Sequence, residues 1–231
     1  MKKTLFFLFV ITLFISTTVK GQECKMYFPD QVGSVREQTN FDKKGKTTGK
    51  VNQEIIARDA VGSSTSVTVS SKAYDKDGKE LSVNQMIIKC NDGIFSFDMK
   101  DYIDKSMLDA YKDMEIIMTG DNLAFPSSLN VGDKLQNASI NIVVKNQGMV
   151  LMNWTISISN RIVAAQESVT TTAGTFSCYK ITYDLQTKTR IMTINSKAAD
   201  WISEGVGSVK MESYDKTGKL LNYSLLSKLK K

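Results

Sequence analysis

The chain contains no histidine, and this absence removes several kinds of chemistry at once. Without histidine there is no Ser-His-Asp or Cys-His catalytic arrangement and no zinc site with an imidazole ligand. The three cysteines are too few for a four-cysteine zinc site. The glycines stand singly, so no glycine-rich phosphate loop is present. We therefore expect neither a metal nor a cofactor.

Proline is also scarce, with 2 residues in 231, so little in the sequence interrupts extended strands. The formal net charge is +6, a modest excess of basic over acidic residues. Many of the lysines fall in turn-like stretches, where they keep loops solvated and strand edges unpaired. No basic stripe with interleaved aromatic residues is present, so a nucleic-acid partner is not expected.

Residues 1–21 have the features of a secretory signal peptide. A basic start precedes an apolar run over 5–15, and Val19 and Gly21 suit the −3 and −1 positions of a cleavage site. Cleavage after Gly21 removes three lysines and lowers the net charge from +6 to +3. We expect residues 22–231 to form the exported protein, located in the periplasm or outside the cell.

A membrane anchor and a lipoprotein are the two other interpretations of this N-terminal segment. A membrane anchor would need about 20 apolar residues, and the run is shorter, so no integral membrane segment is expected in the mature chain. A lipoprotein is suggested by Cys24, but Glu23 stands where lipid attachment needs a small residue.

A six-residue phrase occurs three times, at residues 41–46, 74–79 and 214–219. Each copy has an aromatic residue, an Asp, two polar residues, a Gly and a Lys, and β-prone residues flank each copy. An Asp that opens a type I turn, followed by Gly in the left-handed region, is typical of a short hairpin loop. We expect positive φ at the glycine of each copy, namely Gly45, Gly78 and Gly218.

Alternation of apolar and polar residues predicts about twelve strands. They are expected at 34–41, 49–57, 64–74, 80–90, 94–99, 138–145, 149–159, 161–171, 175–184, 188–194, 207–214 and 220–229. A short irregular piece with Ala198, Ala199 and Trp201 is expected between 188–194 and 207–214. The prediction is a single all-β domain over 22–231, built from antiparallel hairpins as a barrel, half-barrel or sandwich.

One helix is predicted over about 101–113. Ile103, Met107, Ala110 and Tyr111 form a stripe at helical spacing, and charged residues fall on the opposite face. We expect this helix to pack one face onto the sheet.

The cysteines of an exported protein meet an oxidising compartment, so one disulfide and one remaining thiol are expected. Cys178 lies inside a strand-like run and is typical of a small core residue. Cys24 and Cys90 lie at the edges of such runs and are the preferred pair, although sequence alone does not determine connectivity.

The most promising binding feature is an unbroken apolar strand face formed by Val150, Met152, Trp154, Ile156 and Ile158. Phe95 and Phe97 align similarly on another strand. Such a face belongs either to an ordinary core or to the wall of an apolar pocket in a partly open barrel. These seven residues are the candidate ligand-binding set.

Several motifs together resemble a family of exported bacterial proteins described as TapB-like, related to a periplasmic domain of unknown function. They are the string from Thr172 to Ile181, Trp201 with Gly205-Val206-Gly207, the last copy of the hairpin phrase, Cys24-x-x-Tyr27-Phe28-Pro29, and Asp98-Met99-Lys100. The resemblance covers nearly all of the mature chain. It implies an antiparallel β fold akin to the open half-barrels of lipoprotein carriers, and it brings no catalytic residues.

Three classes of function remain. The first is a non-enzymatic envelope protein that binds a protein partner, and the second is a binder of an apolar or lipid-like ligand inside an open barrel. A carboxylate-based hydrolase is third, because no two carboxylates are singled out by the sequence. A volume inside the β framework would favour the ligand binder, whereas an exposed apolar patch on a closed barrel would favour the protein partner.

Overall fold

The computed structural model describes residues 24–103, 108 and 110–231. The expected signal peptide at 1–21 therefore lies outside the described residues. Thirteen strands form one antiparallel sheet with the order β6-β8-β9-β10-β11-β12-β13-β1-β2-β3-β4-β5-β7. Their bounds are β1 Val35–Asp42, β2 Thr47–Val61, β3 Ser64–Asp75, β4 Glu80–Asn91, β5 Ile94–Asp98, β6 Glu115–Gly120, β7 Asn122–Pro126, β8 Ala138–Asn146, β9 Met149–Thr171, β10 Gly174–Lys188, β11 Thr193–Ser203, β12 Gly207–Asp215 and β13 Leu220–Lys230.

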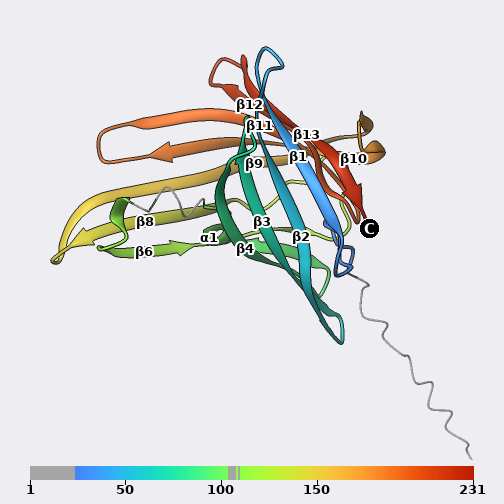
Figure 1. Cartoon of the computed structure of the whole chain (residues 1–231), viewed down its shortest axis with the longest axis horizontal. Coiled ribbons are helices and arrows are strands. Elements are labelled where there is room, and N and C mark those ends of the chain that lie inside the picture. Colours follow the sequence, from blue (N-terminus) through green and yellow to red (C-terminus); the bar gives the residue numbers. More distant parts are fainter. Residues whose placement is uncertain (1–23, 104–107, 109) are drawn as a thin grey trace, which may run out of the picture.

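The sheet curls into a nearly closed barrel (Figure 1). Its two edge strands, β6 and β7, follow each other in the chain and are separated only by Asp121. The Asp121 carboxylate accepts hydrogen bonds from the Ser139 N–H at 2.8 Å and the Ser139 hydroxyl at 3.0 Å. Asp121 thus holds the point where the chain leaves its pairing with β8 and begins to pair with β5.

The three repeated hairpin phrases lie at the same end of the barrel. They form the β1–β2, β3–β4 and β12–β13 turns, and in an up-and-down arrangement alternate turns share an end. Their glycines have φ values of 80° at Gly45, 84° at Gly78 and 87° at Gly218, as the repeat predicts. The β2–β3, β4–β5 and β11–β12 turns lie at the opposite end.

A second layer covers part of the outer wall. The far end of the β9–β10 hairpin folds over β11, β12 and β13, where the Thr172 hydroxyl donates to the Ser227 carbonyl at 3.1 Å. A buried cluster beneath it includes Cys178, Trp201, Val209 and Leu226. Cys178, a free thiol, is fully buried there, in agreement with its expected role as a core residue.

The helix predicted over 101–113 is wrong in its extent. Helix α1 spans only Met99–Tyr102, with its N-terminus capped by the Asp98 side chain, and Ile103 has an extended backbone with φ −75° and ψ 125°. Residues 104–107 and 109 lie outside the described residues. Met99, Ile103 and Leu108 nevertheless pack into one apolar cluster with β8. Helical spacing therefore did not identify the buried face. Ile103 of the predicted stripe packs there, but Ala110 is exposed, and the buried residues Met99 and Leu108 lie outside the stripe.

Four strand assignments also need correction. The strand predicted at 188–194 is wrong, because residues 189–192 form the turn between β10 and β11. The region with Ala198, Ala199 and Trp201 is regular strand β11, and the short strands β6 and β7 were not predicted. Residues 149–171 form one strand, because Asn160 adopts a left-handed conformation (φ 53°) at an irregularity in the β9–β10 pairing. Asn tolerates this conformation better than most residues, so the strand bends at Asn160 without ending.

Candidate functional site

The interior of the barrel contains a cavity of about 570 Å³. Side chains from β1–β5, β7 and β9–β12, together with the α1 region, line it. This volume lies within the range of roughly 300–1,000 Å³ typical of small-molecule sites. The cavity is therefore the principal candidate site.

One end of the cavity is plugged by the segment that precedes β1. Met26, Tyr27 and Phe28 are between 4 and 7% exposed. The Tyr27 ring lies 6.0 Å from the Phe95 ring and 5.4 Å from the Phe125 ring, centroid to centroid. Aromatic contacts of this geometry stabilise a core beyond simple burial, so this end is closed by packed side chains.

The Cys24–Cys90 disulfide fastens the plug to the end of β4, and it is the pairing preferred from the sequence. The Met26 carbonyl also accepts a hydrogen bond of 2.7 Å from the Gly205 N–H in the β11–β12 turn. The plug is thus tied covalently to one wall of the barrel and through its backbone to another.

The cavity opens at the other end, where the repeated hairpins lie. Residues that line it near the plug, such as Ile88 and Phe95, are almost fully buried. Farther along the same walls, Ser82, Asn84 and Thr187 are half-buried, and Gln85 is exposed. This gradient of exposure marks the mouth.

One wall of the cavity is apolar. Ile156 and Ile158 on β9 line it together with Phe95 and Phe97 on β5. Trp154 packs with Ile156 and Ile158 in the cluster beside this wall. The structure therefore brings five of the seven candidate ligand-binding residues to this side of the barrel.

The other two candidate residues lie elsewhere. Val150 and Met152 are absent from the cavity lining, and Val150 is 51% exposed. Their strand continues past the end of β10, whose last pairing with β9 joins Lys188 to Thr155. The alternating pattern is continuous from Val150 to Ile158, but only the part at Ile156 and Ile158 faces the cavity.

The opposite wall carries a polar network that sequence reasoning did not identify. The Arg36 guanidinium donates to the Gln53 side-chain oxygen at 2.5 Å and also to the Ser208 carbonyl. Gln38 donates to the same carbonyl at 3.1 Å. The Ser208 hydroxyl in turn donates to the Asp200 carboxylate at 2.5 Å. All five residues line the cavity.

The available signal for this wall was the i, i+2 spacing of Arg36 and Gln38, which places them on one face of β1. A polar face of this kind is normally exposed to solvent, so nothing in β1 alone indicated an interior position. Arg36 is 3% exposed, and its guanidinium lies 5.1 Å from the Phe28 ring centroid, against the plug.

Burial raises the pKa of Asp200 from 3.8 to about 6, and the Ser208 hydrogen bond and the charge of Arg36 offset part of that rise. The side chain retains some accessible area because it borders the open space of the cavity. Among the described groups that influence its pKa there is no second carboxylate. The cavity lining thus has one deep carboxylate, Asp200, next to an arginine, and it also includes the carboxylate of Asp101, which is not among the groups that shift the pKa of Asp200.

A second buried arginine spans the seam of the barrel. The Arg161 guanidinium on β9 donates to the Ala124 carbonyl on β7 at 2.9 Å and to the Gln136 carbonyl at 2.5 Å. Burial lowers the pKa of Arg161 to about 10, and the side chain is 4% exposed. The hydrogen bonds of Arg161 thus join β9 to the other edge of the sheet.

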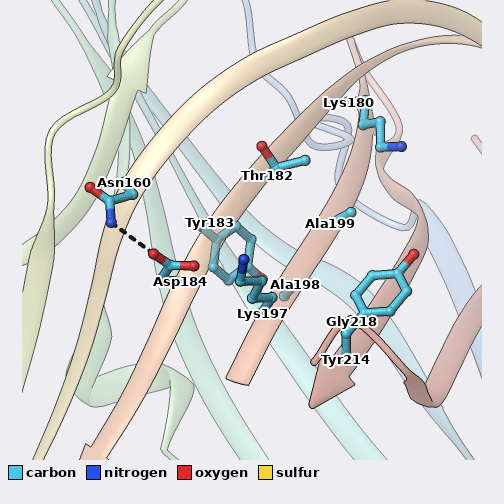
Figure 2. Close-up of a pocket in the computed structure, with 10 residues that line it drawn as sticks. All are labelled: Asn160, Lys180, Thr182, Tyr183, Asp184, Lys197, Ala198, Ala199, Tyr214 and Gly218. Carbon is cyan, nitrogen blue, oxygen red and sulfur yellow. Dashed lines mark hydrogen bonds between the residues drawn. The ribbon is translucent and has the colours of Figure 1, made fainter. Parts of the chain in front are cut away.

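A second hollow of about 370 Å³ lies across β10 and β11, and Figure 2 shows the residues that line it. In Figure 2 its ionisable groups are spread along the wall, with Asp184 hydrogen-bonded to Asn160 at 2.7 Å. The Lys180 ammonium lies 4.7 Å from the Trp201 ring. Asp184 and Lys180 thus already have partners in the protein, and the larger cavity is the better candidate.

No group of three or more His, Cys, Asp or Glu residues in the described part of the chain could hold a metal ion. The helical segments that the structure describes lack the length and apolar character needed to cross a membrane.

The fold is shared with two crystal structures. One is of a presumed exported protein with a YmcC-like fold from Bacteroides fragilis NCTC 9343, with 28% identity, a TM-score of 0.73, and coverage of 90% of this chain and 100% of that chain. The other is of a presumed lipoprotein from Parabacteroides distasonis ATCC 8503, with 24% identity, a TM-score of 0.76 and the same coverage, 90% and 100%. At this identity the second likeness shows the fold alone.

A search of curated proteins found no match. The narrower TapB-like name suggested by the sequence motifs is not carried by any of these comparisons, whereas an exported family of unknown function is supported. Residues 31–226 match the DUF3108-like family, and because this match spans most of the chain, the chain belongs to that family.

Proposed function

We propose that the protein binds an apolar or amphiphilic, lipid-like molecule inside its barrel. The observation that supports this proposal best is the cavity of about 570 Å³, plugged at one end and open at the other. Its apolar wall, with Phe97 and Ile158, suits an acyl chain, and its polar wall, with Arg36 and Gln38, suits a polar group of the same ligand.

An exported location fits this proposal. The residues expected to form a signal peptide, the disulfide between Cys24 and Cys90, and the presumed exported and lipoprotein neighbours all support it. A lipid-like molecule outside the cytoplasm needs an apolar container to move through water. Binding without chemical change needs none of the catalytic groups that the chain lacks.

The expected affinity follows from burial. An acyl chain that buries about ten methylenes gains up to roughly 8 kcal/mol before the cost of association. We therefore expect a dissociation constant near the micromolar range for long-chain fatty acids.

A dansyl-labelled fatty acid tests the proposal, with unlabelled hexadecanoate as competitor. Ala73→Trp introduces a large side chain into the lining and should weaken binding at least tenfold. Val83→Trp is the matched control, because Val83 lies on the neighbouring strand but is 52% exposed, outside the cavity. Its affinity should equal that of the wild type.

Both variants must first show the wild-type circular dichroism spectrum. Absence of saturable binding by the folded wild type would refute the proposal. Unchanged affinity in folded Ala73→Trp would show that the probe binds elsewhere, and would refute the barrel as its site.

A further inference from the structure

Two neighbouring hairpins project past the body of the barrel, β8–β9 and β10–β11, and both point to the left in Figure 1. Their ends carry apolar side chains that are between 50 and 90% exposed. We call these ends the apolar tips, and they comprise Met149, Val150 and Leu151 on one hairpin and Ile191, Met192 and Ile194 on the other. Large apolar residues gathered at exposed positions mark a surface that meets another apolar phase.

The pairing register shows that the tips extend beyond the barrel wall. The last pairing of β9 with β10 joins Thr155 to Lys188, so residues 149–154 of β9 pair only with β8. In the same way β11 pairs with β12 no farther than Ser196. The ends of the two hairpins are thus exposed and apolar, and they do not enclose the cavity.

The charges beside the second tip are basic, whereas the lysine beside the first tip is paired with a glutamate on the neighbouring strand. Lys188 and Arg190 flank the second tip and Lys145 flanks the first, and no acidic residue occurs within 145–151 or 187–194. The Lys145 ammonium forms an ion pair with the Glu115 carboxylate, with an N···O distance of 3.7 Å. Exposed apolar side chains with lysine or arginine next to them favour binding to an anionic lipid surface.

We propose that the two apolar tips insert into the headgroup region of an anionic bilayer and dock the protein there. The tips stand apart from each other in Figure 1, so they offer two small insertion points. A protein interface of standard size needs about 800 Å² of continuous surface on each partner, which favours a lipid surface over a protein.

Docking in this way would also place the mouth of the cavity near the lipid. Ile156 and Thr187 line the cavity a few residues inward from the tips, on the same two strands β9 and β10. The proposal goes beyond ligand binding, because a protein can hold a lipid-like molecule without touching a membrane.

Sedimentation with vesicles of equimolar phosphatidylglycerol and phosphatidylcholine tests the docking. The variant Ile191→Ser/Met192→Ser should lose at least tenfold in vesicle affinity, and Met149→Ser/Leu151→Ser should lose a similar amount. Val61→Ser is the matched control, since Val61 is 80% exposed and ends β2 beside the β2–β3 turn, at the plugged end. Its affinity should be unchanged.

Further measurements distinguish the apolar from the electrostatic contribution to vesicle binding. Lys188→Gln/Arg190→Gln should weaken binding to these vesicles, and vesicles of phosphatidylcholine alone should bind the wild type more weakly. An environment-sensitive dye on Ile191→Cys should shift to the blue on vesicle addition, while the buried thiol of Cys178 stays unlabelled. All tip variants should retain the wild-type affinity for the dansyl-labelled fatty acid, so that failure of docking and failure of ligand binding are distinguished.

Wild-type protein that does not sediment with the anionic vesicles would overturn the proposal. Equal sedimentation of the wild type and both tip variants would overturn it as well. A tip-dependent dimer in sedimentation equilibrium, without vesicle binding, would assign the tips to a contact between protein chains instead.

Discussion

The carboxylate of Asp200 offers the sharpest test of the polar wall. Asp200 lies on β11, faces the cavity, and accepts a hydrogen bond from the Ser208 hydroxyl at 2.5 Å. Burial is the largest influence on its pKa, which rises to about 6, and the opposing influences of Ser208 and Arg36 do not cancel it. The ionised form is therefore less stable in the folded protein than in the unfolded chain.

The sign of the pH dependence follows directly. In the unfolded chain the group titrates near 3.8 and in the folded protein near 6, so between these values the folded state binds more protons. The contribution to stability is fully present below about pH 4 and is lost as pH rises through 6. A rise of this size in pKa corresponds to about 3 kcal/mol of unfolding free energy.

The substitution Asp200→Asn keeps an acceptor for Ser208 but cannot ionise. The variant should equal the wild type in stability near pH 4 and exceed it by up to about 3 kcal/mol at pH 7.5. Urea unfolding at several pH values, followed by circular dichroism, measures this difference. Asp184→Asn on the outer wall is the matched control and should leave the pH dependence of the wild type in place.

The opposite result would be equally clear. If Asp200→Asn is less stable than the wild type at pH 7.5, and this difference disappears as pH falls, then Asp200 is ionised and stabilised by Arg36 in the native state. Burial would then raise the pKa of Asp200 less than the charge of Arg36 lowers it, which contradicts the prediction.

Two other predictions concern the framework. Replacing Cys24 and Cys90 with Ala opens a loop whose ends are 66 residues apart, which should cost about 4 kcal/mol of unfolding free energy in urea titration; a loss below about 1 kcal/mol would show that the plug is held by packing alone. In the native protein a thiol reagent should not react with Cys178, because burial raises its pKa to about 11, and rapid labelling would contradict its position in the core. Gly218→Val should cost about 1–2 kcal/mol, because φ is 87° and no atom lies near the new Cβ; a loss near zero would show that the turn adapts.

The turns were the most predictable part of the fold, because a tight hairpin is specified by residues next to each other in the chain. Asp215 shows this well: its carboxylate accepts the backbone N–H groups of Thr217 at 2.8 Å and Lys219 at 3.0 Å, all within one phrase. The same local contacts recur at Asp42 and Asp75. No distant residue is needed to form these loops.

The polar wall was not predictable for the opposite reason. Arg36 and Ser208 are 172 positions apart, and they meet only because β13 pairs with both β1 and β12. Read strand by strand, Arg36 belongs to a polar face that would normally contact solvent. Closure of the barrel turns that face inward, and the hydrogen bonds of Asp121 and Arg161 lie at a seam that no local pattern marks.

The face of β9 shows how one pattern serves two environments. From Val150 to Ile158 every second residue is apolar, which reports only that this face avoids water. What covers the face depends on where β10 ends, and β10 ends at Lys188. Ile156 and Ile158 are therefore covered by the barrel, whereas Val150 lies past its edge. Apolar side chains that extend beyond the barrel are still stabilised when they are removed from water. A lipid surface at the mouth of the cavity can provide that apolar environment.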